Sequence, residues 1–166
     1  PPADRVDPDR IAVIGHSMGG FVAAELCAAR PEMRGAALLS GVDLGHAFGC
    51  DNTATSVARV DENVGTSAGL HILDGTSPQA LADEARDNAG RWHLADRAER
   101  LAGRPLLIVT SDDGFAGAGA ALAAAVGVIN AARLTTTHFA ADHSFSDCRI
   151  ALQAAVLDWL SGDVAQ

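Results

Sequence analysis

The sequence predicts an α/β fold, with a mostly parallel β-sheet flanked by helices. Ile11 to Ile14 form a continuous apolar run, which is typical of a strand buried on both faces. A short glycine-containing turn follows, and residues 21–29 are rich in helix formers. A second apolar run at 36–39 follows a short connection, and this strand, helix, strand order favours parallel pairing. The 166 residues, 48% of them hydrophobic and 20% charged, suffice for one compact domain with a core.

The middle of the chain has a different composition. Residues 43–75 are rich in Gly, Thr, Asn, Asp and Ser, and this stretch is longer than the roughly 12–15 residues of an ordinary loop. Ser77 and Pro78 mark the start of a helix over 79–88, and a second short helix is expected at 92–101. We therefore expect residues 43–102 to form a lid-like insertion over the active site, within a single domain that covers residues 1–166.

The last third of the chain returns to the alternation of strands and helices. This part begins at Pro105. The sequence contains no visible internal repeat. The expected elements, in chain order, are a strand at 106–109, a flexible access loop at 114–119, a helix around 120–126, a strand at 133–139 and a helix at 147–160.

The segment Gly15-x-Ser17-x-Gly19 lies between the first predicted strand and the first predicted helix. This arrangement is a nucleophile elbow, in which the turn is so tight that side chains two residues either side of the serine would collide with neighbouring elements. The turn would raise the Ser17 hydroxyl above the sheet, beside the free N–H groups of the helix N-terminus. We expect Ser17 to be the nucleophile and the amide of Met18 to be an oxyanion donor.

A serine hydroxyl needs a base within hydrogen-bond reach and an acid that holds the base in one tautomer. His143, which follows the last predicted strand, is the expected base. The acid is expected to be Asp113, after the strand at 106–109, with Asp112 and Asp43 as open alternatives. Asp142 adjoins the histidine, and a capping role suits it better because neighbouring side chains seldom point at each other.

Three segments resemble the α/β-hydrolase superfamily: Arg10-Ile-Ala-Val-Ile-Gly-His-Ser-Met-Gly-Gly20, Pro105-Leu-Leu-Ile-Val-Thr-Ser-Asp-Asp113 and Asp142-His-Ser-Phe-Ser-Asp147. The last segment and the closing helix are most similar to esterases and to prolyl-oligopeptidase-like and dienelactone-hydrolase-like serine hydrolases. The resemblance covers residues 5–161 and implies the chain order Ser, Asp, His. The family's Gly-x-x-Asp pattern aligns with residues 110–113, although threonine replaces the glycine.

The resemblance implies a sheet of about eight strands, of which this sequence supplies the last four. The chain is therefore expected to be the C-terminal half of an α/β-hydrolase fold, truncated at its N-terminus. The missing half would complete the sheet beside the strand at residue 11 and would carry the second oxyanion donor. We expect a chain without it to be poorly soluble.

Charge narrows the range of partners. The net charge of -9, from 12 basic and 21 acidic residues, disfavours nucleic acid and anionic membranes. No run approaches the roughly 18 apolar residues of a membrane helix. The remaining histidines, including His16 and His138, are interpreted as structural or surface residues, and no metal or organic cofactor is required.

The sequence thus predicts a serine hydrolase of carboxylic esters that acts on a small ester or short peptide. A serine peptidase of the prolyl-oligopeptidase type and an inactive remnant of the fold are the alternatives. A cytoplasmic location is favoured.

Overall fold

The computed structural model describes residue 7 and residues 10–48 and 74–165. The chain divides into two compact units, one made of Pro1–Val42 with Leu94–Gln166 and the other of Asp43–His93. The second unit begins where the predicted insertion begins. It ends earlier, because η5 (Leu94–Arg97) and α5 (Ala98–Leu101) pack against helices of the first unit.

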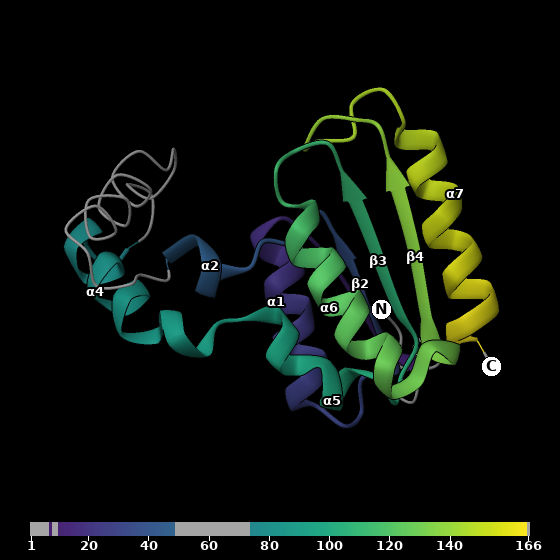
Figure 1. The fold of residues 1–166 in the computed structure, drawn as a ribbon, viewed down its shortest axis with the longest axis horizontal. Helices are drawn as coiled ribbons and strands as arrows, with labels where there is room; N and C mark the ends of the chain where they lie inside the picture. Colours follow the sequence, from purple (N-terminus) through teal and green to yellow (C-terminus); the bar gives the residue numbers. More distant parts are fainter. Residues whose placement is uncertain (1–6, 8–9, 49–73, 166) are drawn as a thin grey trace. The chain divides into compact units, whose positions relative to one another are not determined.

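The first unit contains a four-stranded parallel sheet (Figure 1). Its strands lie in chain order: β1 (Ala12–His16), β2 (Gly35–Leu39), β3 (Leu106–Ser111) and β4 (Leu134–Phe139). All three pairings are parallel, so the carboxyl ends of the strands meet at one edge. The predicted mostly parallel α/β architecture is confirmed.

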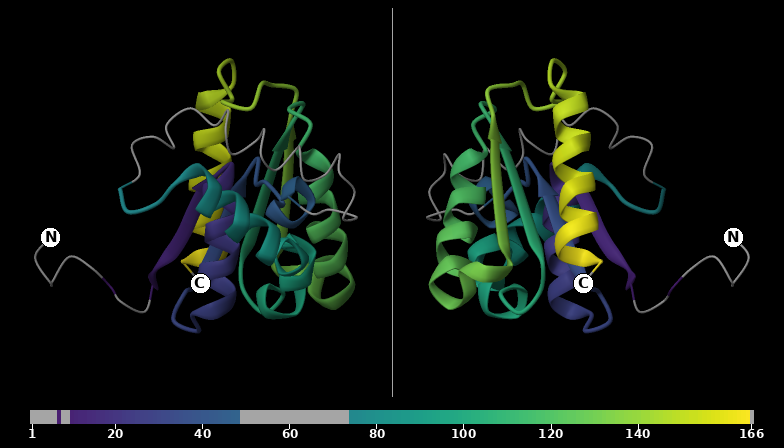
Figure 2. Two further views of the ribbon diagram at one scale, coloured as in Figure 1. Left: turned by 90° about the vertical axis from the view of Figure 1, so that its left-hand side faces the viewer. Right: turned by 90° about the vertical axis from the view of Figure 1, so that its right-hand side faces the viewer.

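Helices cover both faces of this sheet, and Figure 2 shows α6 (Ala116–Asn130) and α7 (Arg149–Trp159) on opposite sides of it. α1 (Met18–Ala29) packs on β1 and β2, and α6 packs on β3 and β4. Side chains of β3 alternate between the faces, as the period of a strand requires. Leu107 and Val109 join a core cluster with Trp159 of α7, whereas Ile108 faces α6.

The helix α6 begins at Ala116, so the prediction of a flexible loop over 114–119 is wrong from residue 116 onward. The reason is the close approach of this helix to β3. A Cβ atom at Gly119 would lie 2.8 Å from Cγ2 of Thr110 and 3.1 Å from Cγ2 of Ile108. Glycine here permits tight packing of helix on sheet, and the glycine-rich composition marks that packing rather than mobility.

By length and composition, the segment Ala116–Arg133 could cross a membrane, with 17% of it buried. The prediction that no run approaches the length of a membrane helix is wrong by this criterion. In the structure the segment lies on the sheet, where Gly119, Leu122 and Val126 are its buried residues. It therefore serves as a layer of the α/β fold.

The second unit, within its described residues, contains α2 (Leu44–Phe48), α4 (Pro78–Asn88) and η4 (Ala89–Arg91). The predicted helix at 79–88 is present, and Oγ of Ser77 accepts a hydrogen bond from the amide of Ala80 at 3.2 Å. Ala82 and Ala85 form its small core. Most of the predicted loop at 43–75 lies outside the described residues, and the lid role stays a prediction.

Candidate active site

The turn between β1 and α1 has an unusual backbone at Ser17, with φ 59° and ψ -124°. A positive φ in a non-glycine residue costs about 1–3 kcal/mol and persists only where surrounding contacts hold it. The Ser17 amide donates to the carbonyl of Leu39 at 2.9 Å, and the Ser17 carbonyl accepts from Gly20 at 2.9 Å. A Cβ atom at Gly15 would lie 1.8 Å from the carbonyl oxygen of Gly19. The sharp turn therefore requires glycine at position 15. The collision predicted on the other side of the serine is wrong, because a Cβ atom at Gly19 would meet no atom of another described element within 4 Å.

Met18 is the first residue of α1, so the helix itself offers its N–H no acceptor. The residue is 62% exposed. An amide donor next to Ser17 thus lies at the positive end of a helix of 12 residues.

His143 and Asp113 meet at the same edge of the sheet. Nδ1 of His143 lies 2.8 Å from Oδ2 of Asp113. Since a carboxylate only accepts, Nδ1 carries the proton and Nε2 is left as the free ring nitrogen. The Asp113 side chain is 2% exposed and that of His143 is 34% exposed, so the acid is buried while the imidazole reaches solvent.

Hydrogen bonds surround the Asp113 carboxylate. Its Oδ1 accepts from the amide of Phe115 at 2.8 Å. Burial raises the pKa of Asp113, but hydrogen bonds from His143, the Phe115 amide, Ser40 and Ser111 outweigh burial and lower the pKa to about 2. The Ser40 and Ser111 hydroxyls are themselves hydrogen-bonded at 2.8 Å and are 2% and 0% exposed. The site therefore keeps Asp113 ionised at neutral pH.

The other candidate acids have different partners. Oδ1 of Asp112 lies 3.3 Å from Nε2 of His138, and Oδ1 of Asp43 lies 3.2 Å from Nδ1 of His93 in the second unit. Oδ1 of Asp142 accepts from the amides of two following residues, at 3.1 Å and 2.9 Å, as expected of a capping residue. These N–H donors lower the pKa of Asp142.

The comparisons with known proteins concern the fold. No family model matches the chain, and no curated protein matches it. Among solved structures, an esterase from Pyrococcus furiosus matches with a TM-score of 0.62 at 15% identity, over 94% of this chain and 54% of its own. A thermostable carboxylesterase cloned from a metagenomic library matches with a TM-score of 0.57 at 24% identity, over 95% of this chain and 56% of its own.

A 2,6-dihydroxy-pseudo-oxynicotine hydrolase matches with a TM-score of 0.60 at 18% identity, over 98% of this chain and 42% of its own. The chain has the α/β-hydrolase fold. It spans about half the length of the three solved structures named here.

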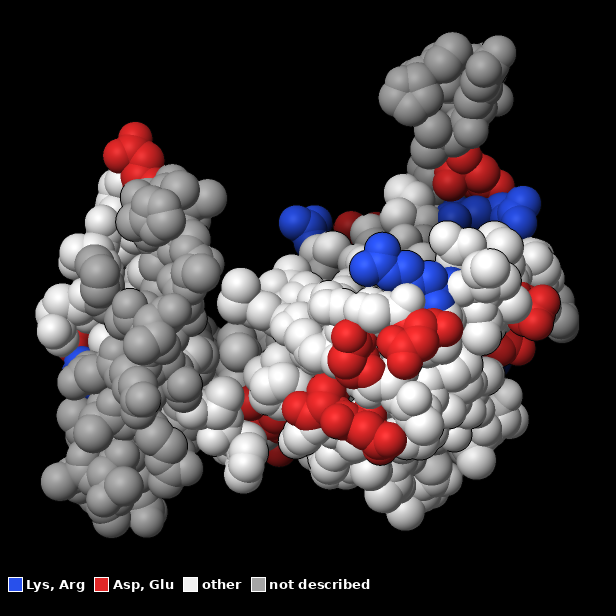
Figure 3. Space-filling view, turned by 90° about the horizontal axis from the view of Figure 1, so that it is seen from above, with Lys and Arg blue, Asp and Glu red and all other residues white. Residues whose placement is uncertain are grey.

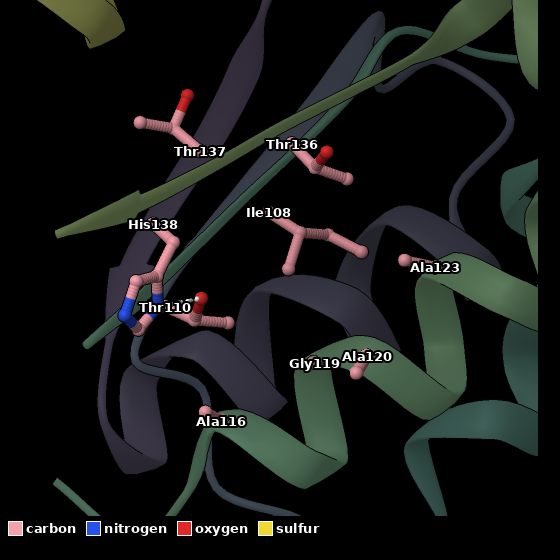
Figure 4. Close-up of a pocket in the computed structure, with 9 residues that line it drawn as sticks. All are labelled: Ile108, Thr110, Ala116, Gly119, Ala120, Ala123, Thr136, Thr137 and His138. Carbon is pink, nitrogen blue, oxygen red and sulfur yellow. Dashed lines mark hydrogen bonds between the residues drawn. The ribbon is translucent and has the colours of Figure 1, made fainter. Parts of the chain in front are cut away.

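In this hydrolase fold, a groove lies between β3, β4 and α6, away from Ser17. Figure 4 shows its residues, and at one end Oγ1 of Thr110 is hydrogen-bonded to Nδ1 of His138 at 2.9 Å. The groove has a volume of about 450 Å³ and is lined by Ile108, Thr110, Ala116, Gly119, Ala120, Ala123, Thr136, Thr137 and His138. Neither Asp113 nor His143 lines it, so the groove is separate from the Asp113–His143 pair.

The edge where the strands of the hydrolase fold end carries negative charge. Figure 3 looks onto this end of the sheet-containing unit and shows acidic side chains gathered in the middle of the face, with basic side chains beside them. Asp112 and Asp142, both of which follow strand ends, are exposed.

Three residues at this edge of the fold escaped the sequence analysis. Ser40 directly follows β2 and Ser111 ends the neighbouring strand β3. Both hydrogen-bond Asp113, but single serines carry no recognisable pattern. His16 was interpreted as a structural or surface residue without a partner being named, and its Nε2 lies 2.7 Å from the carbonyl oxygen of His143. Its place directly before Ser17 was the available signal.

Proposed function

We propose that this chain carries the catalytic residues of a serine hydrolase that cleaves carboxylic esters. Ser17 is the nucleophile, His143 the general base and Asp113 the acid that orients it. The observation that carries the proposal is the 2.8 Å contact between Nδ1 of His143 and a carboxylate that is 2% exposed. The buried acid has a lowered pKa and is hydrogen-bonded to one nitrogen of a partly exposed imidazole. This arrangement leaves the other ring nitrogen free to take a proton.

In the first half of the reaction, Nε2 of His143 removes the Ser17 proton as Oγ attacks the ester carbonyl carbon. The positive charge that forms on the imidazole is stabilised by ionised Asp113. The Met18 amide donates to the oxyanion of the tetrahedral intermediate. The bond from carbon to the alcohol oxygen then breaks, and His143 returns the proton to the departing alcohol.

In the second half, water attacks the acyl group on Ser17. His143 accepts a proton from this water, and the carbon–Oγ bond breaks as the proton passes to Ser17. The products are a carboxylic acid and the regenerated hydroxyl. The strained turn supports this role, because it fixes Ser17 at the helix N-terminus throughout both steps.

A fluorophosphonate probe with mapping of the modified peptide tests the nucleophile. The expected result is a label on Ser17 and its loss in the Ser17→Ala variant. Ser144→Ala is the matched control, because it removes an exposed hydroxyl beside His143 and should leave labelling unchanged. A label on another residue, or none, would overturn the assignment.

We further propose that another polypeptide segment completes the sheet beside β1 and supplies a second oxyanion donor. Among the described residues β1 pairs with β2 alone, and Ile14 of β1 is 42% exposed. On α1, the side chains of Met18, Val22 and Leu26 recur every fourth residue and are 62%, 54% and 38% exposed. A row of exposed apolar side chains on one helix face supports a partner segment at this surface.

Sedimentation of the 166-residue chain tests this second proposal. We expect self-association, and we expect Val22→Glu to reduce it. A monodisperse chain with full esterase activity would contradict the proposal.

A further inference from the structure

His16 occupies a position that links the two halves of the candidate site. It is the last residue of β1 and directly precedes Ser17, so its backbone is part of the strained turn. Its side chain contacts the loop after β4, and this loop carries His143. A residue that belongs to one catalytic segment and bonds to the other can fix the distance between them.

The contact is a hydrogen bond to the main chain. Nε2 of His16 lies 2.7 Å from the carbonyl oxygen of His143. A carbonyl oxygen only accepts, so Nε2 of His16 must carry a proton and donate it. Both the neutral Nε2–H tautomer and the imidazolium satisfy this requirement, so the bond holds the His143 backbone whichever form is present.

The two rings are also in contact. The ring centroids of His16 and His143 lie 4.6 Å apart with planes tilted by 42°, and Phe115 lies 5.3 Å from the His143 ring. These neighbours limit rotation of the imidazole, whose Nδ1 is already bonded to Asp113. The direction of Nε2 is thereby restricted.

The loop that follows His143 is held in a conformation that needs such support. Phe145 has a φ of 53° and is 1% exposed, and its ring contacts that of His16 with centroids 6.1 Å apart. A bulky residue with positive φ is costly unless its surroundings hold it. His16 therefore contacts both His143 and the strained residue beyond it.

From these contacts we infer that His16 is a positioning residue: its Nε2–H bond to the His143 carbonyl sets the placement of the imidazole relative to Ser17. The inference rests on the proposed function for its catalytic consequence. The hydrogen bond itself is independent of that function.

The test compares two amides that differ by one methylene group. In His16→Gln the amide nitrogen reaches about as far as Nε2 of histidine, whereas in His16→Asn it falls short. His16→Phe keeps a ring but lacks the donor. His138→Phe is the matched control, since it removes an imidazole from β4 whose side-chain partners are Thr110 and Asp112.

Two measurements are made on each variant after circular dichroism confirms folding. One is the rate constant for fluorophosphonate labelling of Ser17, and the other is the NMR signal of the His143 Nδ1 proton. Because a small misplacement of a catalytic group is costly, we expect labelling to slow by about ten-fold or more in His16→Asn and His16→Phe. We expect His16→Gln and His138→Phe to stay within about three-fold of the wild type, since both keep the bond.

The NMR signal follows the same order. It should persist in His16→Gln and broaden through faster exchange in His16→Asn. Wild-type labelling and signal in His16→Asn and His16→Phe would overturn the inference, as would a His16→Gln variant as impaired as His16→Asn.

The two proposals fail separately. If Ser17 of the wild type is not labelled, the proposed function is wrong, and the NMR comparison alone decides whether His16 positions the imidazole. If Ser17 is labelled equally fast in all variants and their NMR signals match that of the wild type, the inference about His16 is wrong and the proposed function stands.

Discussion

Replacement of Asp113 by asparagine tests the electrostatics of the site without relying on activity. The change keeps the size of the side chain but removes the charge that accepts hydrogen bonds from His143, the Phe115 amide and two serine hydroxyls. In the wild type these donors hold the carboxylate in its ionised form although the side chain is 2% exposed. The variant therefore loses a stabilising contribution that depends on pH.

The magnitude follows from the shift in pKa. Relative to an ordinary value of 3.8, the pKa of Asp113 is lowered to about 2. Each unit corresponds to about 1.36 kcal/mol, so ionised Asp113 stabilises the folded state by about 2 kcal/mol. Because the folded-state pKa is the lower one, this contribution is fully present above pH 4 and is lost as the pH falls from about 4 through about 2.

The assay is urea denaturation of the wild type and of Asp113→Asn at a series of pH values from about 2 to about 7. The difference in unfolding free energy should shrink by about 2 kcal/mol toward the acid end, since the other carboxylates contribute equally to both proteins. Asp112→Asn is the control, because its side chain is 67% exposed and should shift stability by less than about 0.5 kcal/mol. A difference that stays constant over the whole pH range would refute the reasoning.

Two further predictions concern packing near the site. Gly15→Ala should lower the unfolding free energy by about 3 kcal/mol or more, because its Cβ would lie 1.8 Å from the Gly19 carbonyl oxygen. Gly127→Ala is the control, because a Cβ atom there would lie in open space on α6, and it should be neutral or stabilising by up to about 1 kcal/mol. Thermal melts of both variants measure these changes in stability. Ser111→Ala removes the hydroxyl that is hydrogen-bonded to the buried Ser40 hydroxyl at 2.8 Å. We expect the unfolding free energy to fall by about 1–3 kcal/mol, measured by denaturation. We also expect a higher pKa at Asp113, measured by carboxyl NMR. An unchanged carboxyl titration would show that Ser111 does not support the acid.

The two central strands, β2 and β3, could be predicted from the sequence because they are buried on both faces. The apolar run at Ile11 to Ile14 also predicted a strand, but its expected burial on both faces is wrong, since Ile11 is 38% and Ile14 42% exposed. Leu106 to Val109 is an apolar run with no alternation, and the structure buries all four residues. The Gly-x-Ser-x-Gly spacing likewise identified the turn, since a Cβ at Gly15 has no room there.

What the sequence could not supply were contacts between segments distant in the chain. Asp113 was the expected partner of His143 through the resemblance to the family's pattern, but residue type alone left Asp112 open, because the two residues are adjacent and chemically identical. The end of β3 and the cap on the Phe115 amide decide between them. The start of α6 was misplaced for a similar reason, because Gly119 weakens a helix by propensity while its packing against Thr110 favours one.

The chain-order arrangement of the four strands has a consequence for biosynthesis. A growing polypeptide acquires the segment of Ser17 first, that of Asp113 later and that of His143 last. On the proposed mechanism, a nascent chain that has not yet added β4 holds Ser17 without its base, His143. Esterase activity would then begin only after β4 has paired with β3, so incomplete chains would not hydrolyse esters.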